Sequence, residues 1–266
     1  MNACTSVEAD RKCTHPASAP RLLELVTLIA CVFSAHATAA APSRETIDSA
    51  GAKRSYYIYV PDSLAASTPA PLLVLLHGSG QNGAALMREW TELAADKGIV
   101  LVAPNALDNL YWRLRSDGPT FLRDVITATA SRHPIDARRT YLFGLSGGAV
   151  YALTLSVLES EYFAATAVFA GAWRDDASLA VVPLARRKIP VAIFIGDRDE
   201  FFPMNTVKAT EAALKEAGHP VFVTVLKRQD HSYAGVARSV NREAWNFLAA
   251  IRLESEPIFQ SYEQNH

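Results

Sequence analysis

The sequence predicts an α/β fold: a doubly wound, mostly parallel sheet with helices on both faces. Uninterrupted apolar runs recur along the chain, helical patterns separate them, and 50% of the 266 residues are hydrophobic. Strands that alternate with helices are typical of parallel sheets whose faces are both covered. A chain of this length can also bury the core that such a sheet needs. We therefore expect a single domain over residues 42–266, without a large cap domain.

The predicted strands are of two kinds. The segment 54–61, RSYYIYVP, alternates with period two and ends at a proline, which suits an antiparallel or edge strand. Six further segments are uninterrupted apolar runs, as expected for strands buried on both faces. These runs are 72–78, 99–105, 140–146, 165–171, 191–197 and 221–227.

Five helical patterns lie between or after these strands. They cover residues 84–96, about 120–131, 147–158, 204–217 and 233–253. In doubly wound sheets the connections are right-handed crossovers, and ligands bind beyond the carboxyl ends of the strands. The segment 172–190, between two predicted strands, is too short for a lid domain. We therefore expect an open site at the carboxyl edge of the sheet.

Residues 1–41 differ in character from the rest of the chain. A polar start through Arg21 leads into an apolar run that ends in small residues, which is typical of a secretory signal. We expect cleavage between about Ala37 and Ala41 and a secreted or periplasmic protein. The run LIAC also resembles a lipoprotein cleavage box, but the apolar run continues past Cys31. Anchoring at Cys31 is therefore the weaker alternative, and the run is too short for a stable membrane span.

Charge and cysteine content exclude some classes of partner. The 26 basic and 27 acidic residues leave a formal net charge of -1 without a basic block, which does not favour nucleic acid. Cys4, Cys13 and Cys31 are the only cysteines, and the first two precede any cleavage site. A mature domain would then have no disulfide. We expect neither a metal nor an organic cofactor, and the oligomeric state stays open.

One serine lies between glycines where a strand pattern gives way to a helical one. The segment Gly144-Leu145-Ser146-Gly147-Gly148 fits G-x-S-x-G, and its strand, turn and helix context is that of a nucleophile elbow. Glycines leave room in such a strained turn, which holds the serine oxygen at the head of the helix. The alternative is a glycine-rich turn that carries no chemistry.

A serine nucleophile needs a base to remove its proton and a carboxylate to orient that base. Asp197 and Asp199 follow one predicted strand, and His231 follows the next. The order serine, aspartate, histidine along the chain is typical of serine hydrolases on this kind of sheet. The weaker candidates for the acid are Asp175, Asp176 and Asp230.

Several segments together resemble a known family. They are LLVLLHGSGQN, FLRDVI, IDARRTYLFGLSGGA, GDRDEFFP and DHSY. From about Tyr56 to Leu248 the chain resembles the α/β-hydrolase serine esterases that include polyhydroxybutyrate depolymerase-like and feruloyl-esterase-like proteins, of the carbohydrate esterase family 1 type. The motifs are specific for the fold and less specific for the substrate.

This resemblance implies roles for individual residues. Ser146 matches the nucleophile and His231 the general base. The family pattern G-x-x-D-x-x-x-P fits the segment 196–203 with Asp199 as its acid, so Asp199 is the expected member of the triad. Asp197 is the alternative, and it could instead cap the turn.

The oxyanion hole needs two backbone N–H groups aimed at the developing negative charge. Gly147, which follows the serine, should supply one of them, and either Ser79 or Gly80 should supply the other. The resemblance implies that His77 shapes the loop and is structural. Two further histidines in connecting segments, His133 and His219, are expected at the surface.

Aromatic residues gather at the predicted strand ends and are candidates for the walls of a substrate pocket. They are Tyr111, Trp112, Trp173, Phe201 and Phe202. Packing within the loops is the alternative for each of them.

The resemblance implies an exported serine esterase. Typical polyhydroxybutyrate depolymerases often carry a separate polymer-binding module and cysteine pairs, and this sequence has neither, so a soluble ester is the expected substrate. It would be a short-chain, hydroxyalkanoate-type or aryl ester. The alternatives are a serine peptidase on the same fold and a non-catalytic binding protein that retains the fold.

Overall fold

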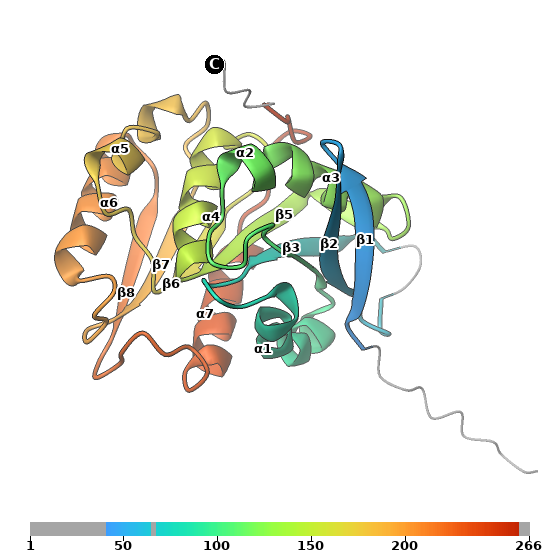
Figure 1. The fold of residues 1–266 in the computed structure, drawn as a ribbon, viewed down its shortest axis with the longest axis horizontal. Coiled ribbons are helices and arrows are strands. Elements are labelled where there is room, and N and C mark those ends of the chain that lie inside the picture. The colour runs from blue at the N-terminus through green and yellow to red at the C-terminus, as the bar shows by residue number, and fades with distance from the viewer. Residues whose placement is uncertain (1–40, 65–67, 261–266) are drawn as a thin grey trace, which may run out of the picture. The chain divides into compact units, whose positions relative to one another are not determined.

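The computed structural model describes residues 41–64 and 68–260. These residues form an eight-stranded sheet in the order β1-β2-β4-β3-β5-β6-β7-β8 (Figure 1). The strands are β1 (Ser43–Ser49), β2 (Ala52–Tyr59), β3 (Ala70–Leu76), β4 (Val100–Pro104), β5 (Ile135–Leu145), β6 (Thr166–Phe169), β7 (Val191–Gly196) and β8 (Val221–Leu226).

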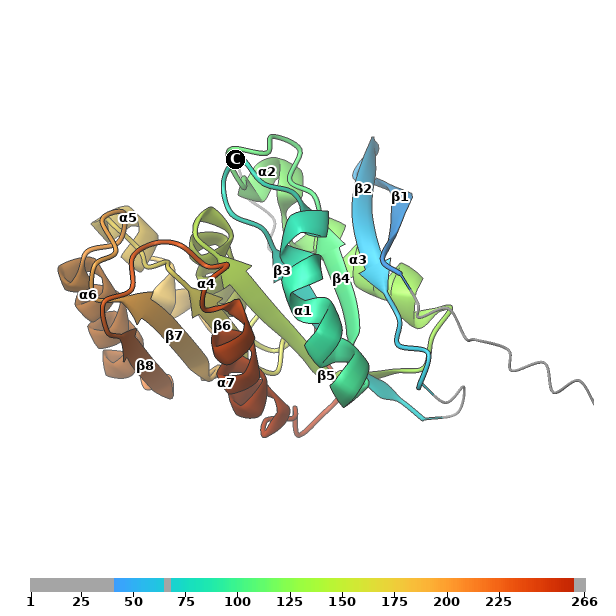
Figure 2. The same cartoon turned by 90° about the horizontal axis from the view of Figure 1, so that it is seen from below.

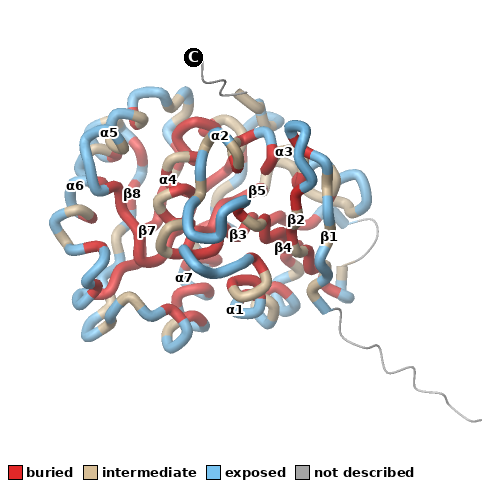
Figure 3. Tube along the Cα trace, in the orientation of Figure 1, coloured by how far each residue is buried: buried red, intermediate tan, exposed pale blue. Residues whose placement is uncertain are grey.

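The sheet is parallel from β4 through β8, and its other two strands are antiparallel. Every residue of β3, β4, β6 and β7 is buried, as is the second half of β5. Strands covered on both faces read as continuous apolar runs, which is why the sequence reveals them. Together with its helices, this sheet confirms the predicted fold class, and Figure 3 shows its buried centre in red.

The two edges of the sheet correct the strand predictions. The first strand, β1, pairs with β2 through residues 43–49, so β2 is antiparallel as expected but is not an edge. The sequence of β1, SRETIDS, is polar and lies mostly at the surface. It contains no apolar run, so the sequence did not predict this strand. At the opposite edge, β8 was expected to be buried on both faces, but Phe222 is 57% exposed and Val225 37% exposed. An edge strand has one neighbour fewer to cover it.

All five predicted helices are present. Figure 2 shows α1 (Gly83–Lys97) and α7 (Ala237–Ala249) on one face of the sheet, with α3 (Pro119–Ala130), α4 (Gly147–Leu158) and α6 (Met204–Glu216) on the other. Three short helices were not predicted: α2 (Leu114–Asp117), α5 (Asp176–Leu179) and the 3-10 turn η1 (Val182–Leu184). The last helix, α7, begins at Ala237 and not at Tyr233, so Tyr233 belongs to the preceding loop.

The predicted export leader falls almost entirely outside the described residues. Residues 1–40, with the candidate lipid anchor at Cys31, are not described, and the leader and the domain boundary stay predictions. Within the described part of the chain, no helix combines the length and apolarity needed to cross a bilayer.

Candidate active site

Ser146 occupies the sharp turn between β5 and α4. Its backbone has φ 54° and ψ -117°, in a region that residues with a side chain rarely adopt. Its N–H donates to the carbonyl of Phe169 on the neighbouring strand β6 at 3.0 Å. Backbone strain of this kind persists where the surroundings enforce it and is concentrated at functional sites.

The glycines around Ser146 are required by close packing. A Cβ on Gly144 would lie 2.4 Å from the carbonyl oxygen of Gly148. A Cβ on Gly148 would lie 2.1 Å from the carbonyl oxygen of Leu76, at the end of β3. Both contacts are far too short for any side chain. The turn can therefore close, and expose the serine at the carboxyl edge of the sheet, only with glycine at these positions.

Three side chains from separate loops meet at this edge. The Nε2 atom of His231 lies 2.9 Å from the hydroxyl oxygen of Ser146, and its Nδ1 atom lies 2.8 Å from a carboxylate oxygen of Asp199. Since a carboxylate can only accept, Nδ1 carries the proton and Nε2 presents its lone pair to the serine hydroxyl. The arrangement can therefore take a proton from Ser146 and hold the resulting imidazolium beside a negative charge.

Asp199 is the acid that the structure brings to His231. Its side chain is fully buried, and its second carboxylate oxygen accepts the backbone N–H groups of Phe201 and Phe202, each at 2.9 Å. The neighbouring Asp197 is exposed and has no bond to the imidazole among the described residues.

The remaining acidic candidates have local roles. The carboxylate of Asp230 accepts the N–H of Ser232 at 2.8 Å, beside the histidine but not on it. Asp175 begins helix α5 and accepts the N–H of Ser178 at 2.7 Å, a bond that lowers the pKa of its carboxyl. Asp176 lies within the same short, exposed helix. Within the described part of the chain, Asp199 is therefore the acid in contact with His231.

The loop after β3 lies against the turn that holds the serine. A Cβ on Gly147 would lie 3.5 Å from the backbone nitrogen of Ser79, so the two backbone segments are neighbours. Gly80 was an expected donor, but its N–H already donates to the carbonyl of Asn109 at 2.8 Å. Among the described residues, the N–H groups of Ser79 and Gly147 have no acceptor. The structure therefore selects Ser79 over Gly80 as the candidate partner of Gly147.

His77 has a structural position, as predicted. Its imidazole is 1% exposed, and Nε2 accepts the N–H of Ala106 at 3.2 Å. Nδ1 therefore carries the proton and donates to the carbonyl of Gly78 at 2.9 Å. Burial lowers the pKa of His77, which keeps the ring neutral. Its own carbonyl accepts the indole N–H of Trp112 at 2.9 Å.

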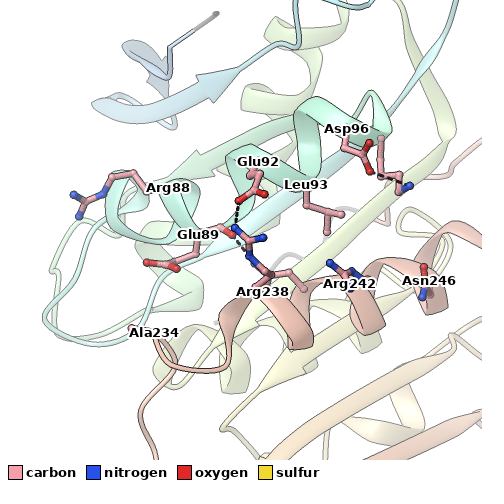
Figure 4. Close-up of a pocket in the computed structure, with 11 residues that line it drawn as sticks. Arg88, Glu89, Glu92, Leu93, Asp96, Ala234, Arg238, Arg242 and Asn246 are labelled. Atoms are coloured by element: carbon pink, nitrogen blue, oxygen red, sulfur yellow. Dashed lines mark hydrogen bonds and ion pairs between the residues drawn. The ribbon is translucent and has the colours of Figure 1, made fainter.

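A cleft of ≈ 360 Å³ opens onto the serine and the histidine. Its walls come from the loop after β3, from the first half of α1 and from the loop that follows His231. A second, charged groove of ≈ 720 Å³ runs between α1 and α7 (Figure 4) and shares Arg88, Glu89 and Ala234 with the cleft. An ion pair between Glu92 and Arg238 at 2.6 Å crosses this groove. The groove holds none of the three side chains that meet at the edge of the sheet.

The aromatic residues predicted to line a substrate pocket differ in how exposed their side chains are. Trp173 is 1% exposed and Phe202 3%, and neither lines the cleft around the serine, so both follow the alternative of packing within the fold. Trp112 is half-buried and stacks on Tyr151 with 5.2 Å between ring centroids. Phe201 is 54% exposed, and its ring centroid lies 4.7 Å from that of His231. None of the four belongs to the walls of the cleft around the serine.

A buried ion pair near the site was not predicted. The guanidinium of Arg54 on β2 lies 2.6 Å from the carboxylate of Asp117, and both side chains are almost fully buried. The same carboxylate accepts backbone N–H groups from Leu107 and Arg113 at 2.8 and 2.9 Å. This pair fixes the loop between β4 and α3. No local pattern marks it, because its two residues are 63 positions apart.

The histidine predictions need one further correction. His219 was expected at the surface but is 3% exposed, because the turn that carries it folds against the segment before β7. Its Nδ1 atom bonds to the carbonyl of Ile189 at 3.1 Å, and its Nε2 atom has no partner among the described residues. Burial lowers the pKa of His219. No group of three or more potential metal ligands was found within the described ranges.

A strained serine on a strand-turn-helix, at the carboxyl edge of a mostly parallel eight-stranded sheet, defines the α/β-hydrolase class. The model of the dienelactone hydrolase family matches residues 103–250. This segment is more than half of the chain, and it contains Ser146, Asp199 and His231. The chain therefore belongs to the dienelactone hydrolase family.

Individual relatives agree with the resemblance seen in the sequence. A poly(3-hydroxybutyrate) depolymerase from Ralstonia pickettii is 31% identical over 54% of this chain and 36% of its own length. The chain thus spans about a third of that relative. A thermostable esterase has a TM-score of 0.64 at 21% identity, covering 79% of this chain and 63% of that one. A ferulic acid esterase from Anaeromyces mucronatus has a TM-score of 0.62 at 15% identity, covering 79% and 91%. At these sequence identities, the two comparisons show that this chain shares its fold with both esterases and show nothing further.

Proposed function

We propose that the protein is a serine hydrolase of carboxylic esters. One observation carries this proposal: His231 bridges the hydroxyl of Ser146 and the carboxylate of Asp199, at 2.9 and 2.8 Å. A serine hydroxyl is a weak nucleophile until an adjacent base removes its proton, and a carboxylate fixes the tautomer of that base. Membership in the dienelactone hydrolase family supports the same reaction class.

Acylation begins when the oxygen of Ser146 attacks the ester carbonyl and its proton passes to Nε2 of His231. The carbonyl π electrons move onto oxygen and form a tetrahedral oxyanion. When this oxyanion collapses, the bond to the alkoxy oxygen breaks. The imidazolium returns its proton to that oxygen, and a neutral alcohol leaves. Asp199 stays ionised and stabilises the imidazolium during this step.

Deacylation repeats the same steps with water. The imidazole of His231 takes a proton from water, the hydroxide oxygen attacks the acyl carbon, and the bond to the oxygen of Ser146 breaks. The proton returns to Ser146, and a carboxylic acid leaves. The N–H groups of Gly147 and Ser79 stabilise both oxyanions, and losing one such donor costs about 3 kcal/mol of transition-state stabilisation.

The surroundings of the cleft support an ester with an apolar part. On the loop after β4, beside the carbonyl that binds Gly80, Leu107, Leu110 and Tyr111 are 64%, 50% and 58% exposed. Phe201 lies exposed on the histidine side. Large apolar side chains held in water beside a reacting group are typical of a binding surface. The proposed substrate is therefore a soluble short-chain, hydroxyalkanoate-type or aryl ester.

The proposed site of action is outside the cytoplasm. Residues 1–41 have the polar start, apolar run and small-residue end of a secretory signal. Sequencing the amino terminus of protein recovered from the culture medium or periplasm tests this proposal. An intact amino terminus on protein confined to the cytoplasm would refute it.

Labelling with a fluorophosphonate tests the nucleophile. We expect folded protein to be labelled on Ser146 and the variant Ser146→Ala to remain unlabelled. Labelling of neither protein would contradict the proposal and favour a non-catalytic binding protein, whereas labelling of both would place the reactive nucleophile on a residue other than Ser146. A panel of p-nitrophenyl, hydroxycinnamoyl and hydroxybutyrate esters then ranks the substrates. A matched amide panel separates esterase from peptidase, since a peptidase would cleave the amides at comparable rates.

A further inference from the structure

The loop that carries His231 has a single buried residue. From Lys227 to Val236 every residue is exposed or half-exposed except Tyr233, which is 7% exposed. The loop is tied down before the histidine, because the N–H of Arg198 donates to the carbonyl of Gln229 at 2.9 Å. After the histidine, Tyr233 is the residue that reaches into the core. His231 therefore lies between two attachment points.

Tyr233 connects this loop to both helices on its face of the sheet. Its hydroxyl donates to the side-chain oxygen of Asn241, which is 1% exposed on α7. The side-chain nitrogen of Asn241 donates to the carbonyl of Glu89 on α1 at 2.7 Å. Asn241 is the only polar member of the buried stripe of α7. A buried amide without partners is costly, and these two bonds satisfy both ends of the Asn241 amide.

The ring of Tyr233 also contacts the strands that hold the serine. Its centroid lies 5.1 Å from that of Phe169 and 6.0 Å from that of Phe143. The carbonyl of Phe169 accepts the N–H of Ser146, and Phe143 lies on β5, which leads into the serine. One side chain thus links the histidine loop to the backbone that fixes the serine. Tyr233 is also part of the wall of the cleft.

We propose that Tyr233 and Asn241 are positioning residues that set the distance between His231 and Ser146. This inference rests on the proposed ester hydrolysis. Neither residue touches the reacting atoms. Proton transfer needs the imidazole within hydrogen-bond reach of the hydroxyl, and a misplacement of about 1 Å can lower a rate by about 100-fold. The bonds from Tyr233 to Asn241 and from Asn241 to Glu89 hold the exposed loop at the required position.

The test compares two buried tyrosines. In Tyr233→Phe the ring remains, and the hydroxyl is lost together with its bond to Asn241. We expect kcat to fall about tenfold while KM stays nearly unchanged, since the cleft keeps its shape. Tyr141→Phe is the matched control. Its hydroxyl donates to the carbonyl of Ile251, beyond the end of α7, at 2.6 Å, and its fully buried ring contacts Trp245 on α7 with 5.9 Å between centroids.

A double variant separates positioning from stability. In Tyr233→Phe with Asn241→Leu, both polar groups are removed, so no unpaired amide oxygen remains. We expect the melting temperature to recover toward that of the parent while kcat stays low. The inference is overturned if the double variant regains full kcat, or if Tyr141→Phe lowers kcat as much as Tyr233→Phe.

Fluorophosphonate labelling of the parent protein distinguishes the failure of this inference from the failure of the proposed function. A parent that labels at Ser146 while Tyr233→Phe labels at the same rate contradicts the positioning role alone. A parent that does not label contradicts the proposed function and the positioning role together.

Discussion

Two carboxylates lie in the connections between strands, Asp117 at the end of α2 and Asp199 in the loop after β7, and both side chains are fully shielded from solvent. Asp117 faces a permanent cation, since Arg54 lies 2.6 Å away and also bonds to the carbonyl of Asn105. Asp199 faces the imidazole of His231 at 2.8 Å. One carboxylate is neutralised in every state of the protein, whereas the other gains a cationic partner only when His231 is protonated.

The two carboxylates differ in how completely their oxygens are bonded, and this separates a structural carboxylate from a catalytic one. The carboxylate of Asp117 is neutralised by Arg54 and accepts hydrogen bonds from two backbone N–H groups and from the hydroxyl of Ser116. Asp199 is held by two backbone N–H groups that leave one oxygen free for His231. A buried ion pair with complete partners fixes a loop. A buried carboxylate with an incomplete set can stabilise a cation that forms during the reaction.

The largest expected effect comes from removing the charge of Asp199. In Asp199→Asn the amide can no longer enforce the Nδ1–H tautomer of His231, so kcat should fall about 10⁴-fold. Steady-state hydrolysis of p-nitrophenyl butyrate measures the loss. The matched control is Asp197→Asn, two residues away and exposed, which should stay within about twofold of the parent. Equal losses in the two variants would remove Asp199 from the proposed mechanism.

Asp117→Asn should instead act on stability. It leaves the Arg54 guanidinium buried without its counter-charge, so the free energy of unfolding should fall by about 3–5 kcal/mol, as measured by urea denaturation. For comparison, Glu92→Gln breaks an ion pair whose side chains are 75% exposed and should cost less than about 1 kcal/mol. If the two variants lost the same stability, the buried pair would not be fixing the loop.

Phe201→Ala should have a smaller effect on activity. The ring of Phe201 covers His231 at 4.7 Å between centroids, and its removal admits water to the bond between the imidazole and Asp199. We expect a several-fold loss of kcat/KM, well below the loss for Asp199→Asn. Phe222→Ala removes a ring of similar exposure from the amino-terminal end of β8 and is the control. If the two variants were equally active, Phe201 would not shield the bond between His231 and Asp199.

The smallest expected effect concerns His219, a buried imidazole without a carboxylate. Burial lowers its pKa below the ordinary value of 6.5, so below about pH 6.5 the unfolded chain binds a proton that the folded protein does not. Stability contributed by the neutral ring is therefore complete above that pH and is lost as pH falls toward the lowered pKa. His219→Asn should flatten the decline of melting temperature between pH 6.5 and 5, as measured by thermal denaturation at each pH. An unchanged slope in His219→Asn would contradict this.

The strands and helices that carry the site were predictable because their cause is local. The apolar runs that become β3, β5 and β7 are continuous since both faces of these strands are covered. The edges were harder to predict. Polar β1 has no apolar run, and β8 has an apolar run although Phe222 and Val225 face solvent. Whether a strand is an edge depends on its neighbours, which a single segment does not record.

In the site, too, features with a local cause were predictable and features that depend on distant segments were not. Ser146 was identifiable because the glycines that its strained turn requires are adjacent in the chain. Trp173 was a candidate for a pocket wall, but it is 1% exposed and its indole N–H donates to the hydroxyl of Thr154 on α4 at 3.1 Å. His219 looked like a surface residue and is buried. Both errors have one cause: segments distant in sequence decide the burial of a loop side chain.

The strands β2 to β8, the five long helices, the turn at Ser146 and the chain order of serine, aspartate and histidine were readable from the sequence alone. These features depend on backbone conformation and hydrophobic periodicity, which act between near neighbours. The three-dimensional arrangement was needed to show that the N–H of Gly80 is bonded to Asn109, to bring the carboxylate of Asp199 to His231, and to pair Arg54 with Asp117. Hydrogen bonds and ion pairs depend on distances of a few ångströms, and folding alone sets such distances between residues far apart in the chain.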